Sequence, residues 1–302
     1  MKVKDGIIGL IIGDALGVPV EFTSRSELIE TPVTRMEGYG TYNQPAGTWS
    51  DDSAMALATM HSIVQKQCID YTDIMDKFVD WLYNAKYMQG NHTFDCGITT
   101  STAINNYKSG KYSPLECGCK GEKDNGNGSL MRILPLAFIK DIDYESIENV
   151  SALTHAHKRS RIACVLYVEM AKSMIENEDL TMEEHINLAC DKIKDYYKDS
   201  PELKHFEKIF NNELDDLSGK GYVIYTFEVV VHCLLTTDNF RDAVLKAVNI
   251  GGDTDTNATI CGGLAGIFYG YDNIPVDWIN EIYRIDEVFS LCERYEAFCD
   301  ES

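Results

Sequence analysis

The chain has 302 residues, of which 44% are hydrophobic and 25% are charged, the proportions of a folded globular protein. These proportions exclude a disordered or collagen-like chain. The sequence contains no run of about 18 apolar residues, so we expect no membrane span. With 27 basic and 48 acidic residues the net charge is −21. Such a chain repels a phosphate backbone, and we expect no nonspecific binding to nucleic acids.

The ten cysteines have no regular spacing, and most of them fall within apolar helical patterns. We therefore expect them to be small, reduced, hydrophobic side chains, as is typical of a cytoplasmic protein. The excess of acidic residues should mostly hydrate the surface, although part of it could hold cations.

Helical periodicity dominates the chain, and no pair of alternating strands joined by a hairpin turn is present. The segment 222–236 is apolar almost all round and rich in β-branched residues, but its length and isolation favour a buried helix. The sequence predicts an all-α fold in a single compact domain covering residues 1–302. The predicted helices cover residues 4–16, 52–66, 71–87, 98–108, 129–139, 144–156, 159–177, 182–197, 222–236, 239–248, 255–269, 275–284 and 286–298.

Two clusters of carboxylates and hydroxyls stand at predicted helix starts. The first contains Ser50, Asp51 and Asp52, and the second contains Asp253 and Asp255 with adjacent threonines. Helix capping explains one acidic residue at such a place easily, and two less well. Two clusters of the same composition suggest that they converge in space.

Hard oxygen ligands of this kind suit Mg²⁺, Mn²⁺ or Ca²⁺. The second cluster is not an EF-hand, because Ala258 stands where the loop needs glycine and Leu264 where it needs glutamate. Zinc is disfavoured because no histidine or cysteine joins either cluster. Glu21 lies between two apolar neighbours, so we expect it to be partly buried. If Glu21 joins the four aspartates of the two clusters, the site carries five negative charges, which two divalent cations would nearly balance.

An ordered set of motifs gives the chain a resemblance to the ADP-ribosylglycohydrolase family across nearly its whole length. The motifs are Gly9-x-x-x-Gly13-Asp14-Ala15-x-Gly17-x-Pro19-x-Glu21-Phe22, Trp49-Ser50-Asp51-Asp52-Ser53, Asn125-Gly126-Asn127-Gly128-Ser129-Leu130-Met131-Arg132, Thr154-His155 and Gly251-Gly252-Asp253-Thr254-Asp255-Thr256-Asn257-Ala258. The resemblance implies an all-helical domain with a binuclear Mg²⁺ or Mn²⁺ centre between helix N-termini. It also implies cleavage of the glycosidic bond between ADP-ribose and an acceptor.

Particular site residues follow from that resemblance. The positions that match the family's metal ligands are Ser50, Asp51, Asp52, Asp253, Asp255 and Thr256. The family often has threonine where this chain has Ser50, and the oxygen ligand is retained. Glu21 matches an acidic residue that takes part in catalysis or gating, and the expected catalytic residues are Glu21, Asp51, Asp95 and Asp253.

The glycine-rich stretch from Asn125 to Ser129 runs into a predicted helix, where its backbone N–H groups could face a phosphate. A simple capped turn is the alternative. The stretch lacks the Lys-Ser/Thr of a P-loop, so it does not imply nucleoside triphosphate chemistry. The resemblance implies that this loop, formed by Asn125, Gly126, Asn127, Gly128 and Ser129, cradles the pyrophosphate of the substrate.

His155 and His157 could form a zinc pair, a core pair or a substrate contact, and the residues by themselves favour a structural role. The resemblance places His155 near the diphosphate or the ribose. The segment around Asp95 resembles the dinitrogenase-reductase-activating branch, which acts on ADP-ribosyl-arginine. There Asp95 would face the scissile ribose or its guanidinium, whereas a cap for helix 98–108 is the alternative.

The expected function is that of a metal-dependent hydrolase that removes ADP-ribose from modified proteins, above all from arginine, at an oxocarbenium-like transition state. Either Glu21 or Asp95 could be the general acid or base. Two alternatives stay open at this point. One is an O-glycosidic hydrolase acting on ADP-ribosyl-serine or O-acetyl-ADP-ribose, and the other is a non-catalytic ADP-ribose-binding or toxin-neutralising relative.

Overall fold

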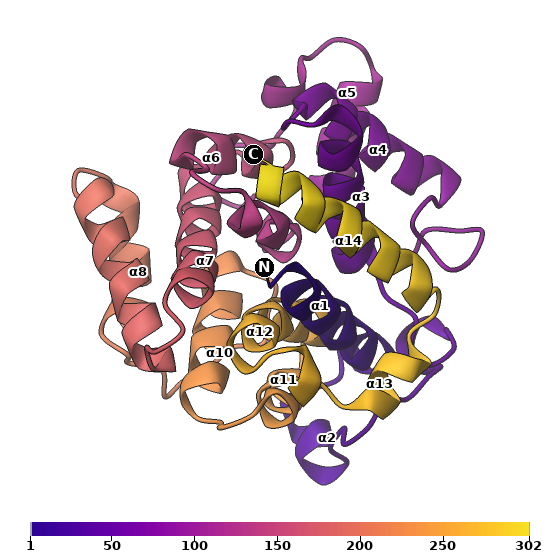
Figure 1. The fold of residues 1–302 in the computed structure, drawn as a ribbon, viewed down its shortest axis with the longest axis vertical. Helices are drawn as coiled ribbons and strands as arrows, with labels where there is room; N and C mark the ends of the chain where they lie inside the picture. The colour runs from indigo at the N-terminus through magenta and orange to yellow at the C-terminus, as the bar shows by residue number, and fades with distance from the viewer. Residues whose placement is uncertain (1, 302) are drawn as a thin grey trace.

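Two helices cross at the centre of the molecule, α1 (Val3–Gly17) and α12 (Thr254–Tyr269) (Figure 1). A β-carbon on Gly9 would collide with the carbonyl oxygen of Gly262, and one on Gly17 would collide with the first turn of α12. Glycine at these positions lets the two backbones touch. The helices are therefore antiparallel, and the residues that follow α1 lie beside the start of α12.

The remaining helices pack around this pair in a computed structural model that describes residues 2–301. They are α2 (Arg25–Glu30), α3 (Asp51–Lys66), α4 (Tyr71–Asn84), α5 (Ile98–Lys108), α6 (Tyr144–Ala152), α7 (Lys158–Glu176), α8 (Met182–Tyr196), α9 (Glu207–Phe210), α10 (Val223–Leu235), α11 (Phe240–Val248), α13 (Val276–Glu281) and α14 (Ile285–Glu301). No strand forms within the described residues, which contain only isolated β-bridges. The predicted all-α fold is confirmed. The two end residues of the predicted 1–302 domain lie outside the described range.

The segment 129–139 is not the α-helix that the sequence predicts. It forms two short 3₁₀ turns, Leu130–Arg132 and Leu134–Phe138. Pro135 has no N–H to donate to a carbonyl four residues earlier, and its ring would obstruct that carbonyl, so an α-helix cannot run through it. The glycine-rich loop therefore leads into a three-residue turn rather than the N-terminus of an α-helix. The dipole argument for its binding a phosphate is lost.

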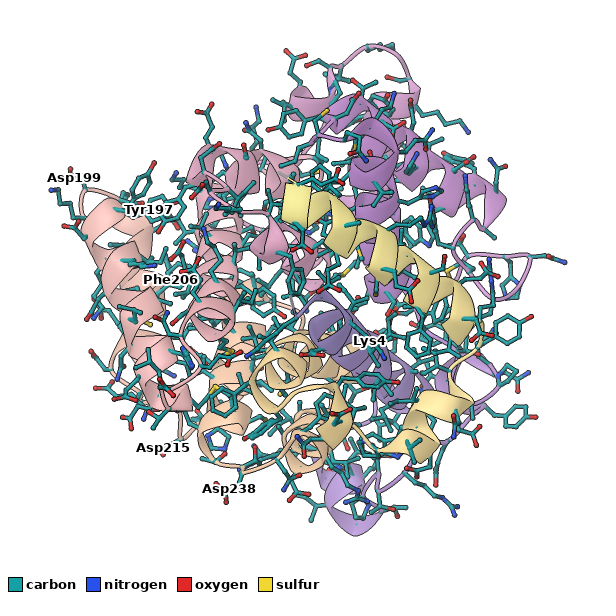
Figure 2. The ribbon with its side chains drawn as sticks, viewed as in Figure 1. Lys4, Tyr197, Asp199, Phe206, Asp215 and Asp238 are labelled. Carbon is teal, nitrogen blue, oxygen red and sulfur yellow. The ribbon has the colours of Figure 1, made fainter. Side chains whose placement is uncertain are left out.

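The core and the surface agree with the composition. All ten cysteines are free, and most are buried. Phe206 lies inside the fold beside α8, whereas Asp199, Asp215 and Asp238 point outward at its edge (Figure 2). Among the described residues, no helix has the length and apolarity needed to cross a bilayer.

Candidate functional site

Asp14, near the end of α1, fixes the position of the first acidic cluster. Its side chain is fully buried, and one carboxylate oxygen accepts a hydrogen bond from the backbone N–H of Ser50 at 2.9 Å. The other oxygen accepts from the N–H of Ser53 at 2.9 Å and from its hydroxyl at 2.6 Å. Burial raises the pKa of Asp14 to about 6, and the bonds from Ser53 and Ser50 oppose this rise. Asp14 thus ties the start of α3 to α1.

The two predicted clusters do converge. Ser50 is the N-cap of α3, and its hydroxyl accepts a hydrogen bond from the N–H of Asp52 at 3.3 Å. From the first turn of α12, the hydroxyl of Thr256 donates to Oδ1 of Asp52 at 3.4 Å. Because α1 contacts both helices, it brings their N-termini together.

A third carboxylate group joins them on the open side. Oxygen atoms of Glu21, Asp95 and Asp255 all lie within 4.8 Å of one another. Asp95 does not cap α5, because Gly97 occupies the N-cap position there. Its backbone has φ of +49°, in the left-handed region that aspartate tolerates better than most residues. Among the predicted metal ligands, this compact trio includes only Asp255.

Burial governs the electrostatics of these carboxyls. Burial, together with the nearby charge of Asp95, raises the pKa of Glu21 to about 9. Burial also raises the pKa values of Asp51, Asp52 and Asp255 well above their usual range, with neighbouring carboxylates adding to the effect.

Several of the buried oxygens lack any partner. Oε2 of Glu21, Oδ2 of Asp52 and Oδ2 of Asp255 are buried and receive no hydrogen bond. Buried carboxylates without compensation are costly, and hard divalent cations are the usual way to compensate a cluster of them. The donor set therefore suits a hard divalent cation.

We predict that the chelator-treated protein loses thermal stability as the pH rises from 5 to 8.5. Because the pKa of groups such as Glu21 is raised by folding, the folded state keeps protons that the unfolded chain releases near pH 4.5. The stability that these protonated groups contribute is fully present below pH 4.5 and is lost as the pH rises toward 9. The melting temperature measured by circular dichroism should fall by roughly 5 °C or more, since about 1 kcal/mol corresponds to a few degrees. Asp255→Asn should reduce the dependence of the melting temperature on pH, and Asp238→Asn, at an exposed site, should not. A melting temperature that does not change with pH in wild type would contradict the prediction.

A cavity of about 740 Å³ opens onto the carboxylates. It lies within the size range of small-molecule sites. Of the predicted residues, those that line it are Glu21, Asp51, Asp52, Asp95, Gly126, Asn127, Gly128, His155, Asp253 and Thr256. The predicted residues that do not line it are Ser50, Asn125, Ser129 and Asp255. Asp255 lies behind the lining, with a carboxylate oxygen within 4.8 Å of those of Glu21 and Asp95.

The glycine-rich loop is held by a second loop that sequence reasoning missed. The N–H of Asn127 donates to the carbonyl of Gly221 at 3.1 Å, and the side-chain amide of Asn127 donates to Oδ2 of Asp253 at 2.8 Å. Asn125 and Ser129 point into the core, where they accept hydrogen bonds from Ser160 and Ser151. Their place is structural, and only the middle of the loop faces the cavity.

The segment 219–221, which lies outside every predicted helix, lines the cavity too. The close spacing of Gly219 and Gly221 was the available signal, since a side chain at Gly219 would collide with the backbone of Gly251. Lys220 between them and Lys123 add two positive charges to a cavity otherwise rich in carboxylates.

The two histidines have different surroundings, and they do not form a metal pair. His155 is buried, its Nδ1 pairs with the hydroxyl of Thr154 at 2.8 Å, and its other edge lies against the glycine-rich loop. Burial, together with the nearby charge of Arg132, lowers the pKa of His155 to about 3, so the ring is neutral. His157 caps α7 and lies 3.3 Å from Oε2 of Glu122, outside the cavity.

We predict that Gly128→Val raises the dissociation constant for ADP-ribose at least about tenfold. A β-carbon at Gly128 would lie 2.8 Å from Cε1 of His155 and 3.0 Å from the hydroxyl of Thr100, so it closes the cavity wall. Gly126→Ala, whose β-carbon would be 3.4 Å from Nε2 of His155, should have a smaller effect. Gly90→Val is the control, because no tight contact surrounds Gly90. Unchanged affinity by calorimetry in a folded Gly128→Val protein would show that this loop is only a turn.

A loop after α2 fixes Glu21, and no pattern in the sequence predicted this contact. The hydroxyl of Thr41 donates to the backbone carbonyl of Glu21 at 2.8 Å. The hydroxyl of Tyr42 hydrogen-bonds the Glu21 carboxyl, and the ring of Tyr42 packs against Phe94 with centroids 4.9 Å apart. Tyr42 therefore contacts both Glu21 and the residue before Asp95.

The geometry agrees with what is found in known proteins. The family model for ADP-ribosylglycohydrolase matches residues 1–301. The chain belongs to the ADP-ribosylglycohydrolase family. The named members of this family are hydrolytic enzymes, and an acidic group able to hold a metal ion is present in this chain as well.

Two bacterial relatives are named for what they act on. The chain is 28% identical to the ADP-ribosylarginine hydrolase Tri1 of Serratia proteamaculans, over 97% of this chain and 78% of that protein. It is 30% identical to the ADP-ribosyl-(dinitrogen reductase) glycohydrolase of Rhodospirillum rubrum, over 91% of this chain and 88% of that protein. A solved structure titled "ADP-ribosylglycohydrolase-related protein complex" has the same fold, with a TM-score of 0.82 at 23% identity, covering 99% of this chain and 98% of that one.

Proposed function

We propose that this protein hydrolyses the N-glycosidic bond between the distal ribose of ADP-ribose and an arginine side chain of a modified protein, and that it requires two divalent cations, Mg²⁺ or else Mn²⁺. One observation carries the proposal: a cavity of about 740 Å³ brings six carboxylates, a glycine-rich loop and two lysines together. The names of the two bacterial relatives support the arginine linkage.

The cations would be held by the two convergent helix starts. The residues we assign to them are Ser50, Asp51, Asp52, Asp253, Asp255 and Thr256. The partnerless buried oxygens of Asp52 and Asp255 support this assignment. When bound, the cations would supply positive charge that orients the ribose hydroxyls and favours deprotonation of a water.

The remaining cavity residues would bind the substrate. The N–H groups around Gly126 and Gly128, with Lys123 and Lys220 at the same cavity, suit a diphosphate, which needs hydrogen-bond donors and positive charge. The neutral ring of His155 would contact the ribose or the diphosphate without adding a charge.

The reaction requires a proton acceptor and a partner for the leaving group. As the bond from the anomeric carbon to nitrogen breaks, its electron pair stays on nitrogen, and the cationic guanidinium leaves as neutral guanidine. Water adds to the same carbon and gives up a proton, which ends on the guanidine. We assign proton acceptance to Glu21, because the bound cations would lower its pKa from about 9 and leave its carboxylate ionised, and we assign pairing with the guanidinium to Asp95.

The test is release of free ADP-ribose from an ADP-ribosyl-arginine peptide, measured chromatographically with Mg²⁺ and with EDTA. We expect turnover with Mg²⁺, loss of at least about a hundredfold with EDTA, and recovery when Mg²⁺ is restored. Full activity in EDTA would contradict the metal assignment. Binding of ADP-ribose with no turnover in any metal would instead favour a non-catalytic binding protein.

A further inference from the structure

A second cavity, of about 430 Å³, lies where α3, α14 and the connection between α4 and α5 meet. Its floor is apolar and buried, and is formed by Trp49, Leu57, Val288 and Leu291. It shares no lining residue with the catalytic cavity. Its volume falls in the range of small-molecule sites, and its mostly apolar floor suits the ring of an organic ligand.

A polar pair forms one wall of this second cavity. Nδ1 of His61 and the hydroxyl of Tyr87 are 2.9 Å apart, and the indole N–H of Trp49 donates to the carbonyl of Tyr87 at 2.8 Å. Burial lowers the pKa of His61, and the charges of Lys77, Lys86 and Arg294 lower it further. Two carboxylates, those of Asp286 and Glu287, also line the cavity, together with three basic side chains.

Arg294 is the cation of this cavity that has no acidic partner. Lys86 lies 3.4 Å from Asp80, and Arg284 forms an ion pair with Glu287. The guanidinium of Arg294 donates only to the carbonyl of Ser290, at 3.3 Å, and no carboxylate within residues 2–301 forms an ion pair with it. An exposed guanidinium beside an apolar floor is suited to an acidic group.

The walls of the second cavity hold unusual backbone conformations. Tyr87 and Arg284, which both line the cavity, have positive φ, of 72° and 58°. Such conformations are costly outside glycine and cluster at ligand-binding segments. The Arg284 side chain also holds the connection in place by donating to the carbonyl of Met88 at 3.2 Å. The same connection continues to Asp95 in the catalytic cavity.

We propose that this second cavity binds a small molecule with an aromatic body and a single acidic group. The aromatic ring would lie on Trp49 and Leu291, and the acidic group would pair with Arg294. Carboxylate, sulfonate and phosphate share the chemistry that Arg294 recognises, which is a compact negative charge.

Two dyes with the same aromatic body provide the test. The probe is 8-anilinonaphthalene-1-sulfonate, and its matched neutral control is N-phenyl-1-naphthylamine. Binding is followed by energy transfer from tryptophan, since Trp49 forms the floor, and is measured with saturating ADP-ribose so that the catalytic cavity is occupied. We expect the sulfonate to bind at least about tenfold more tightly than the neutral dye.

Variants then locate the binding. Arg294→Gln should remove the preference for the sulfonate and leave the neutral dye unaffected, whereas Arg35→Gln, at an exposed arginine elsewhere, should change neither. Ser290→Trp should block both dyes, because Ser290 is an exposed residue at the cavity wall. The proposal is overturned if the sulfonate does not bind, if ADP-ribose displaces it, or if Arg294→Gln and Ser290→Trp bind it like wild type.

Discussion

Asp52→Asn is expected to reduce ADP-ribose release by about a thousandfold or more, to background, while the helical fold is retained. Asparagine fits the same space, so no cavity is formed, but it removes the negative charge from the centre of the two converged helix starts. Asp52 has one oxygen bonded to Thr256 and one buried oxygen with no partner, and the proposal assigns this free oxygen to a cation. A thousandfold loss corresponds to about 4 kcal/mol of transition-state stabilisation.

A second measurement separates loss of metal from loss of fold. Without metal, Asp52→Asn should melt at the same or a higher temperature than wild type, because it relieves repulsion among buried carboxylates. We expect Mg²⁺ to raise the melting temperature of wild type and to leave that of Asp52→Asn unchanged. Asp238→Asn makes the same chemical change at an exposed site and should behave as wild type in both assays. Normal turnover by Asp52→Asn in Mg²⁺ would remove Asp52 from the metal site.

Most of the fold could be predicted because its helices are long and have one clearly apolar face. Two errors have local causes that were visible in the sequence. Pro135 was overlooked within 129–139, and the short helix α2 was missed although Ser24 and Glu27 form a capping box at its start. The antiparallel contact of α1 with α12 was harder to see. Gly9 and Gly13 weakened the apolar pattern of the first helix, and their role is apparent only when α12 lies against them.

The candidate site was predictable where its residues lie at helix starts. Ser50, Asp52 and Asp255 stand in two similar motifs, and that similarity was enough to suggest that they converge. The parts that depend on tertiary contacts could not be read in this way. The carboxylate of Asp14 accepts a hydrogen bond from the start of another helix, and Tyr42 contacts Glu21 from a loop with no distinctive sequence pattern.

Asp95→Asn should reduce turnover of ADP-ribosyl-arginine by roughly ten- to a hundredfold while changing ADP-ribose affinity much less. Free ADP-ribose has no guanidinium, so it does not use the pairing that Asp95 would offer. Loss of a charge-assisted hydrogen bond in a partly buried site costs about 1.5–3 kcal/mol, and it lowers kcat/KM for the arginine conjugate because the guanidinium is charged from binding until the bond breaks. Asp124→Asn is the matched control, because Asp124 lines the same cavity and its carboxylate accepts from the N–H of Gly121.

Comparison of two substrates decides the linkage. An arginine leaving group carries a positive charge, five N–H donors and no acceptor, whereas a serine oxygen carries no charge for Asp95 to pair with. Wild type should therefore prefer the arginine-linked peptide to the serine-linked one, and Asp95→Asn should lose most of that preference by losing activity on arginine alone. If wild type prefers the serine linkage, or if the variant loses both activities equally, Asp95 does not recognise the guanidinium and an O-glycosidic substrate replaces the arginine conjugate.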